Sequence, residues 1–178
     1  GWSYDRLLAE WTAQPKLDGG GVGKILASTY LDSYGKSSDG ITMSVVDLRM
    51  IPVLENAVKL LGTAIRALPP AVRSGVLKVA QQSQSFYYSD YVDAGDFIKR
   101  LVGARIQGLD PAILSRMSQA LQAYTIGSHA SDNHADATGV SMWIPPDLYS
   151  FDSHSPRYAG LKFSQRTGWA QALQSMVE

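Results

Sequence analysis

The chain has 178 residues, the length of a single domain that can bury a hydrophobic core of its own. Lys and Arg number 16, as do Asp and Glu, so no excess of positive charge is present to hold nucleic acid or an anionic membrane surface. A hydrophobic fraction of 45% excludes a disordered chain, and no apolar run approaches the ~18 residues that span a bilayer. We therefore expect a globular protein that binds no nucleic acid and has no membrane span.

The absence of cysteine removes thiol catalysis, thiolate metal ligands and disulfides in one step. The first residues, Gly1 to Asp5, resemble neither an initiator start nor a signal peptide, which has a basic start followed by an apolar stretch. We therefore expect the chain to begin inside a longer protein.

The N-terminal segment is predicted to form two helices. Ser3 is placed to cap the first, whose apolar stripe is Leu7, Leu8 and Trp11 and which ends before Pro15. The second helix is predicted over 22–33, preceded by the glycine run 19–21 and followed by the polar loop 36–40.

A strand and the longest helix come next. Residues 41–46 are β-branched and begin with an apolar–polar alternation, which predicts a strand that is partly exposed on one face. Asp47 is expected to cap the longest helix, which ends at Pro69, and a further helix is predicted over 71–81. The apolar stripe of the longest helix consists of Ile51, Leu54, Val58, Leu61, Ile65 and Leu68.

Two further helices follow the aromatic loop 86–91. Asp93 and Asp96 have the spacing of a capping box, which predicts the start of a helix that Gly108 closes. Asp110 precedes a proline, and this order predicts an N-cap with Pro at the first position of the next helix.

The C-terminal segment is predicted to contain a polar loop over 128–136, a second strand over 138–144 and a final helix over about 167–177. The whole chain is thus expected to hold two strands and about seven helices. Because an isolated pair of strands is only marginally stable in water, we expect both strands to join a sheet that another segment supplies.

Four features invite a catalytic or binding interpretation: the glycine-rich stretch 19–24, the polar loop 128–136, Ser141 and the aromatic loop 86–91. The glycine-rich stretch 19–24 lacks the Walker spacing, since Asp18 and Ile25 stand where glycine and Ser or Thr are needed, so it is read as a helix-entry loop. The polar loop 128–136 holds His129, Asp132, His134 and Asp136. These side chains are a mixture of donors that suits a divalent ion, but their spacing matches no standard metal site. A solvated loop with turn-forming residues is the favoured interpretation of that stretch.

Ser141 is read as an outward strand residue, because the Gly-x-Ser-x-Gly elbow of a serine hydrolase is absent. The rings of Phe86, Tyr87, Tyr88 and Tyr91 have two interpretations: a stacking wall for a peptide or sugar, or a loop packed on its own core.

Four aspartates, Asp47, Asp93, Asp96 and Asp110, are better explained as helix caps than as acid/base groups.

Several segments, taken in order, are similar to one enzyme family. They are Gly1-Trp2-Ser3-Tyr4, residues 25–30 with Tyr34, Thr42-Met43-Ser44-Val45-Val46-Asp47-Leu48, residues 139–145, and the Tyr158, Leu161, Phe163, Ser164, Thr167 and Trp169 pattern. In this order and spacing they resemble the portion of clostripain-like cysteine peptidases that follows the catalytic cysteine. The resemblance runs nearly from end to end of the chain.

The resemblance implies an α/β fold, with a caspase-like sheet flanked by helices. Residues 1–178 would be its helix-rich C-terminal part and would contribute about two strands, with the catalytic half upstream. It further implies a secreted protein, extracellular or periplasmic, that cleaves peptide bonds after basic residues, Arg especially, through a thiolate with a histidine as proton carrier. A bound basic side chain would need buried or partly buried carboxylates.

No catalytic residue is carried over, because the family's nucleophilic cysteine and its histidine both precede this portion. His129, His134 and His154 do not match the catalytic histidine. Substrate-binding residues stay unassigned, no metal or cofactor is assigned to this chain, and Ca²⁺ enters only because some members use it. The implied partners are the upstream catalytic segment and a peptide or protein substrate.

Two alternatives stand beside this interpretation. One is a binding module, related to the family but without its catalytic pair, that holds a peptide in the cleft or on the aromatic loop. The other is a structural helical domain of a secreted or envelope protein, in which the strands at 41–46 and 138–144 would pair only with each other.

Overall fold

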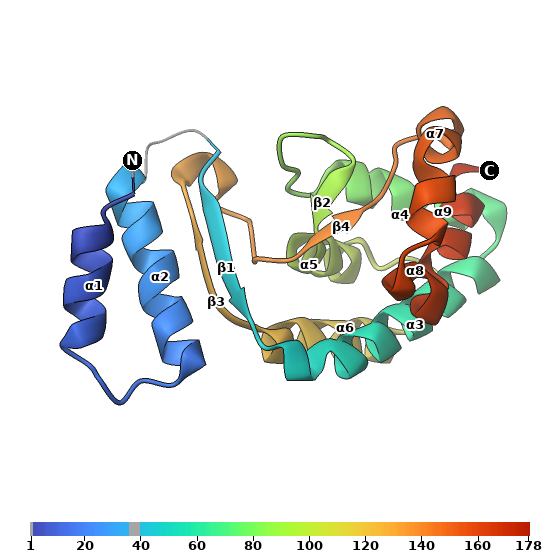
Figure 1. The fold of residues 1–178 in the computed structure, drawn as a ribbon. Helices are drawn as coiled ribbons and strands as arrows, with labels where there is room; N and C mark the ends of the chain where they lie inside the picture. The colour runs from blue at the N-terminus through green and yellow to red at the C-terminus, as the bar shows by residue number, and fades with distance from the viewer. Residues whose placement is uncertain (1, 36–39) are drawn as a thin grey trace.

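The computed structural model describes residues 2–35 and 40–178, and its fold is α/β (Figure 1). The helices are α1 (Tyr4–Thr12), α2 (Gly19–Tyr34), α3 (Ile51–Ala67), α4 (Pro70–Gln81), α5 (Ala94–Ala104), α6 (Pro111–Tyr124), α7 (Leu148–Ala159), α8 (Lys162–Thr167) and α9 (Trp169–Val177). The strands are β1 (Thr42–Val46), β2 (Tyr91–Asp93), β3 (Thr125–Ala130) and β4 (Ser141–Trp143), with 3₁₀ turns η1 (Leu48–Met50) and η2 (Asp132–His134). Gly1 and most of the predicted polar loop 36–40 lie outside the described residues.

The described strands form two antiparallel pairs, β1 with β3 and β2 with β4. In the first pair Met43 lies opposite His129, and the register shifts between Val45 and Val46. In the second pair Val92 lies opposite Met142. The sheets are therefore small, and each leaves strand edges without a partner in the described part of the chain.

The predicted strands are confirmed in position but not in number or pairing. The strand expected over 138–144 is limited to Ser141–Trp143, and the structure has four strands where the sequence predicted two. Each predicted strand pairs with a strand of this same chain, whereas we expected partners from another segment. The two predicted strands do not pair with each other either, so the pairing required by the structural alternative is wrong.

Two of the predicted loops are in part regular structure. Strand β3 covers the first residues of the polar loop 128–136, and η2 covers three more. Tyr91, the last residue of the aromatic loop 86–91, begins β2. Both strands were missed because short runs rich in Gly, Ser, His and Tyr lack the β-branched alternation that signals a strand.

The helices differ from prediction in three respects, two of them boundaries and one the presence of helices that were not predicted. The glycine-rich stretch 19–24 is the first turn and a half of α2 and not an entry loop. Helix α5 ends at Ala104, with Arg105 in the left-handed conformation, so Gly108 lies beyond its end. Helices α7 and α8 have no counterpart among the predicted elements.

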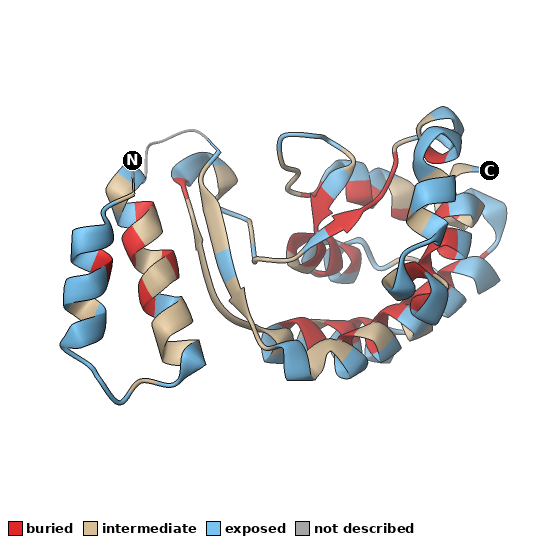
Figure 2. Cartoon of the chain, viewed as in Figure 1, coloured by how far each residue is buried: buried red, intermediate tan, exposed pale blue. Residues whose placement is uncertain are grey.

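The hydrophobic core lies between α3, α4, α5, α6 and α9, whose facing sides carry most of the buried residues (Figure 2). The predicted stripe of α3 is confirmed from Leu54 to Leu68, all buried, while Ile51 is half-buried. Trp169 is fully buried against α3, where Gly62 allows the close approach of α9 because an added Cβ would lie 3.3 Å from Ala172. The Trp169 indole nitrogen donates to the Trp143 carbonyl at 3.3 Å, which ties β4 to the core.

Helices α1 and α2 form an outer layer on one face of the β1–β3 sheet (Figure 1). Helix α2 contacts both strands, and Gly23 lies against Val45. Of the predicted α1 stripe only Leu7 is buried, whereas Leu8 and Trp11 are exposed. The reason is that α1 packs against α2 and touches no strand closely, so only one narrow side of it is covered.

Replacement of Leu61 by alanine tests the packing of α3. Leu61 has no exposed surface, so Leu61→Ala is expected to lower the free energy of unfolding by about 2–5 kcal/mol, measured by urea denaturation. Val53→Ala is the matched control, because Val53 lies on the same helix with 49% of its surface exposed and should cost less than about 0.5 kcal/mol. Equal effects of the two substitutions would contradict this orientation of α3.

Candidate functional site

The outer edge of β4 presents unpaired backbone groups. Val140 accepts from Ala94 N at 2.8 Å and Ile144 N donates to Asp90 at 2.7 Å, so the even-numbered residues of this segment turn their amides and carbonyls toward β2. Ser141 and Trp143 therefore turn theirs to the opposite side, where the Trp143 carbonyl accepts from Trp169. A strand edge with free N–H and C=O groups is a template for another strand.

A largely apolar cavity of about 580 Å³ lies along this edge. Four consecutive residues, 140–143, line it; successive strand residues face opposite sides of a sheet, so the cavity follows the strand edge and not one face. Its remaining lining comes from Tyr91 of β2, from α3 and α6, and from the α7–α8 region, and includes Val58, Met117, Leu121, Tyr158 and Phe163. At its rim the guanidinium of Arg166 pairs with Glu55 at 3.3 Å.

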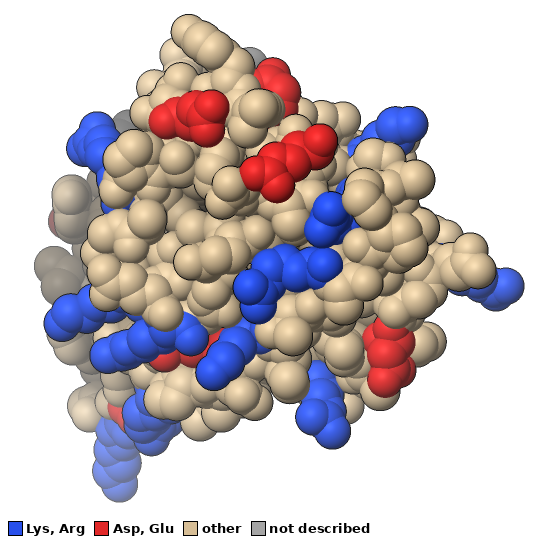
Figure 3. Space-filling view, turned by 90° about the vertical axis from the view of Figure 1, so that its right-hand side faces the viewer, with Lys and Arg blue, Asp and Glu red and all other residues tan. Residues whose placement is uncertain are grey.

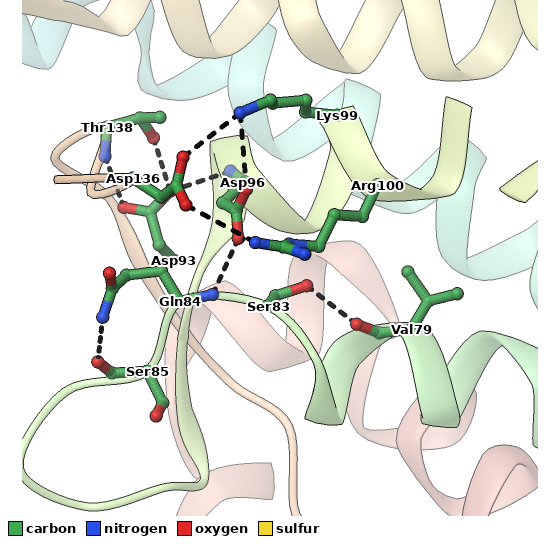
Figure 4. Close-up of polar contacts among 10 residues, drawn as sticks. All are labelled: Val79, Ser83, Gln84, Ser85, Asp93, Asp96, Lys99, Arg100, Asp136 and Thr138. Carbon is green, nitrogen blue, oxygen red and sulfur yellow. Dashed lines mark hydrogen bonds and ion pairs between the residues drawn. The ribbon is translucent and has the colours of Figure 1, made fainter. Parts of the chain in front are cut away.

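A buried carboxylate, Asp93, holds the segment that leads into β4 (Figure 4). Its oxygens accept from the backbone of Thr138 at 2.8 Å, from the Thr138 hydroxyl at 2.7 Å and from Gly139 N at 3.2 Å. The same carboxylate accepts from Asp96 N at 2.9 Å, which confirms Asp93 as the N-cap of α5.

Asp96, the second buried carboxylate, belongs to an ionic network (Figure 4). One of its oxygens accepts from Gln84 N at 2.7 Å and from Arg100 Nε at 2.6 Å. Asp136 joins the network from the β3–β4 connection through Lys99 at 3.2 Å and Arg100 at 3.5 Å. The capping box predicted for Asp93 and Asp96 is therefore only half present, because Asp93 N donates to Gln84 and not to Asp96.

These carboxylates have structural partners and are poor receptors for a substrate's basic side chain. Both Asp93 oxygens accept hydrogen bonds from this chain, and Asp96 is already paired with Arg100. The second Asp96 oxygen is buried without a hydrogen bond, and Lys99 Nζ lies 4.0 Å from it. The sequence interpretation of Asp93 as a cap and not an acid/base group agrees with this arrangement.

Of the other predicted caps, Asp110 is confirmed, whereas Asp47 caps η1 and not α3, whose N-cap is Met50. Ser3 lies at the N-cap position of α1 without a side-chain hydrogen bond to the helix. Asp47 accepts from Arg49 N at 3.0 Å and caps η1, which runs directly into α3. The hydrogen bonds from the Arg49 side chain, and then from its backbone, lower the pKa of Asp47. Asp110 accepts from Ala112 N at 2.8 Å at the start of α6, with Pro111 at the first helical position.

The structure does not gather the residues considered for a metal site. His129 lies in β3, His134 stacks on Phe86 with 5.8 Å between ring centres, and Asp136 is taken up by Lys99 and Arg100. Within residues 2–35 and 40–178 no group of three His, Cys, Asp or Glu residues is arranged to hold a metal ion.

The structure also places the glycine-rich stretch 19–24 and Ser141. Asp18 accepts from Gly21 N at 2.8 Å, so a carboxylate of the chain itself occupies the N-terminus of α2 where a phosphate would bind. Ser141 lies on the exposed edge of β4, as the sequence interpretation expects.

In the aromatic loop 86–91, one ring packs on the chain itself and three rings are exposed, so each of the two interpretations, packing on the core or a wall for a ligand, fits part of the loop. Phe86 is half-buried against His134, whereas Tyr87, Tyr88 and Tyr91 are exposed. The three tyrosines form a chain of ring contacts, with centres 4.8 Å apart between Tyr87 and Tyr88 and 6.2 Å apart between Tyr88 and Tyr91. Tyr91 also lines a hollow beside Trp143, so the rings continue into a concave site.

Sequence reasoning missed the contribution of α7 to this hollow. His154, Arg157 and Tyr158 of α7 line it at the spacing i, i+3 and i+4, which is the signal of a single helix face, and Leu161, at the start of α8, lies beside them. Pro156 obscured that signal, because proline inside a segment argues against a helix.

The face that α3, α4, α7 and α9 turn outward carries a band of Lys and Arg side chains (Figure 3). The exposed Lys59, Arg66 and Lys78 belong to α3 and α4, and none of them forms an ion pair with another described residue. The overall charge balance of the chain therefore hides an uneven distribution.

No family model, no curated protein and no solved structure matches the chain. Among the helices of the described residues, none combines the length and the apolar character that crossing a bilayer requires.

Replacement of Gly95 tests the contact between α5 and the segment before β4. An added Cβ would meet the Thr138 side chain, with 2.7 Å to its Cβ, so Gly95→Ala should lower the free energy of unfolding by about 1–3 kcal/mol. Gly103→Ala, on the same helix and facing open space, should instead raise it by about 0.5–1 kcal/mol. Thermal or urea unfolding measures both, and a stabilising Gly95→Ala would contradict the contact.

Proposed function

We propose that residues 1–178 are the C-terminal part of a clostripain-like cysteine endopeptidase that cleaves peptide bonds after basic residues, Arg in particular. The chain supplies scaffold and one wall of the substrate cleft, and an upstream segment supplies the cysteine and the histidine. The basis for the family is the ordered set of motifs in the sequence. Alone, the chain is inactive because it has no cysteine.

The observation that best supports this proposal is the open edge of β4 beside the apolar cavity. Ser141 and Trp143 have backbone groups directed away from β2, and the cavity of about 580 Å³ runs along them. An extended apolar strand placed there would pair with the Ser141 N–H and C=O and the Trp143 N–H, since the Trp143 carbonyl already accepts from Trp169, and would fill the cavity with its side chains. A catalytic half with a parallel sheet of apolar strands has the chemistry to do both.

The outer edge of β1 is a second place for such pairing. Ile41 accepts from Ser131 N at 2.8 Å, so the odd-numbered residues of β1 turn toward β3. Thr42 and Ser44 turn their backbone groups outward. The Ser44 hydroxyl donates to the Gly139 carbonyl at 2.7 Å, which brings the β1 sheet and the segment leading into β4 together. A caspase-like sheet that uses both edges is part of the proposal.

In the proposed reaction the thiolate of the upstream segment attacks the scissile carbonyl, and the upstream histidine carries the proton to the leaving amine. The buried carboxylates of this chain are paired internally, so the group that recognises the basic side chain is assigned to the upstream segment as well.

Two measurements on the protein from its own source test the proposal. After non-denaturing purification, mass spectrometry should find a polypeptide upstream of Gly1, continuous or associated, with a cysteine that an arginine chloromethyl ketone alkylates. In hydrogen exchange, the amide of Ser141 should exchange at least about tenfold more slowly in that protein than in the isolated 178-residue chain. Ile144 is the control, because its amide already donates to Asp90 and should be protected in both samples.

The two measurements test different parts of the proposal. Without a reactive cysteine the peptidase proposal falls, whatever the exchange data show. With a reactive cysteine but unchanged exchange at Ser141, the family assignment stands and the β4 edge is not where the catalytic segment docks.

A further inference from the structure

A hollow of about 330 Å³ lies at the surface between β2, β4 and α7, and we call it the aromatic hollow. It is lined by Tyr91, Trp143, His154, Arg157, Tyr158 and Leu161. Its volume is at the lower end of the range for small-molecule sites, enough for one ring and a short polar group. The inference drawn from it is independent of the proposed function.

The rings of the aromatic hollow are held in position by contacts behind them. The Trp143 indole nitrogen donates to Asp90 at 2.9 Å, and the ring of Phe151 stacks on Trp143 with 6.0 Å between centres. Tyr158 packs on Trp143 at 4.7 Å. Trp143 itself is only 6% exposed, whereas Tyr91, which lines the same hollow, is 46% exposed. A fixed floor with an exposed ring beside it suits a flat ligand, which would stack on rings already in place.

The polar groups of the aromatic hollow are basic. Among the residues that the structure describes, Arg157 and His154 line it and no Asp or Glu does. Arg157 forms no ion pair with any described residue, whereas His154 Nδ1 contacts the Ser150 carbonyl at 3.2 Å and leaves Nε2 available. Burial raises the pKa of Tyr158, so its hydroxyl keeps its proton and adds no negative charge. The hollow therefore combines apolar walls with an unpaired guanidinium.

We propose that the aromatic hollow binds an aromatic group that carries a carboxylate. The ring lies among Tyr91, Trp143 and Tyr158, and the carboxylate pairs with the guanidinium of Arg157, with which it can form two parallel hydrogen bonds. Two sources present this chemistry: a free aromatic acid and a peptide that ends in an aromatic residue with a free α-carboxylate.

Titration of the isotope-labelled chain with N-acetylphenylalanine, followed through the indole N–H signal of Trp143, tests the proposal. A dissociation constant on the order of 1 mM is expected for so small a ligand. N-acetylphenylalanine amide, which keeps the ring and lacks the charge, should bind at least about fivefold more weakly. An acetylated tripeptide ending in phenylalanine separates the sources: tighter binding than the single residue favours a peptide terminus, and weaker binding favours the free acid.

Two variants separate the charge from the ring. Arg157→Gln should weaken binding of the acid about fivefold and leave the amide unchanged, and Arg116→Gln, at an exposed arginine of α6, should change neither. Tyr91→Ala should weaken both ligands. Circular dichroism checks that each variant is folded. Equal affinity for acid and amide, no effect of Arg157→Gln, or no shift of the Trp143 signal at about 10 mM ligand would overturn the proposal.

Discussion

The buried carboxylate of Asp93 is the interaction on which the arrangement of the strands depends. It caps α5, accepts from Thr138 and Gly139, and so fixes the segment that enters β4 against the start of the helix that follows β2. A buried charge without such partners would be very costly, and here four hydrogen bonds from the chain offset that cost. Because β4 is only three residues long and pairs on one side, its own ladder could not hold it in place.

The hydrogen bonds of Asp93 hold β4 in place, but they leave the outer edges of the strands uncovered. The helices α3, α6 and α9 bury a continuous core, yet the strands beside them form two separate pairs with unpaired outer edges. A protein that exposes strand edges usually protects them with charge, bulges or cover. Here the β4 edge adjoins an apolar cavity, and Glu55 and Arg166 are the charged residues that line it in the described part of the chain. This combination suits a surface that a further strand completes, and it is where we propose that the catalytic segment docks.

The sequence predicted the elements whose pattern is strong and local. The stripe of α3 repeats at helical spacing over five turns, and Asp47, Asp93 and Asp110 are followed by the amides they cap, so all of these were found. Strand β3 was missed because Gly127, Ser128 and His129 have no apolar alternation and are held in place by β1, far away in the sequence. The aromatic hollow was missed for the same reason: it exists only where α7 meets β4, and no single segment contains it. Long-range pairing, and not propensity, decides both.

The way in which α1 and α2 are attached to the rest of the molecule affects its local unfolding. Helix α1 packs mainly on α2, with Tyr4, Leu8 and Trp11 left in contact with water, and α2 reaches the rest of the protein through the face of a two-stranded sheet. Few buried apolar contacts therefore join this layer to the core around Trp169. A layer attached in this way is a cooperative unit that can detach and reform while the core stays folded. We therefore expect the layer of α1 and α2, which comes first along the chain, to open at a lower free energy than the core around Trp169.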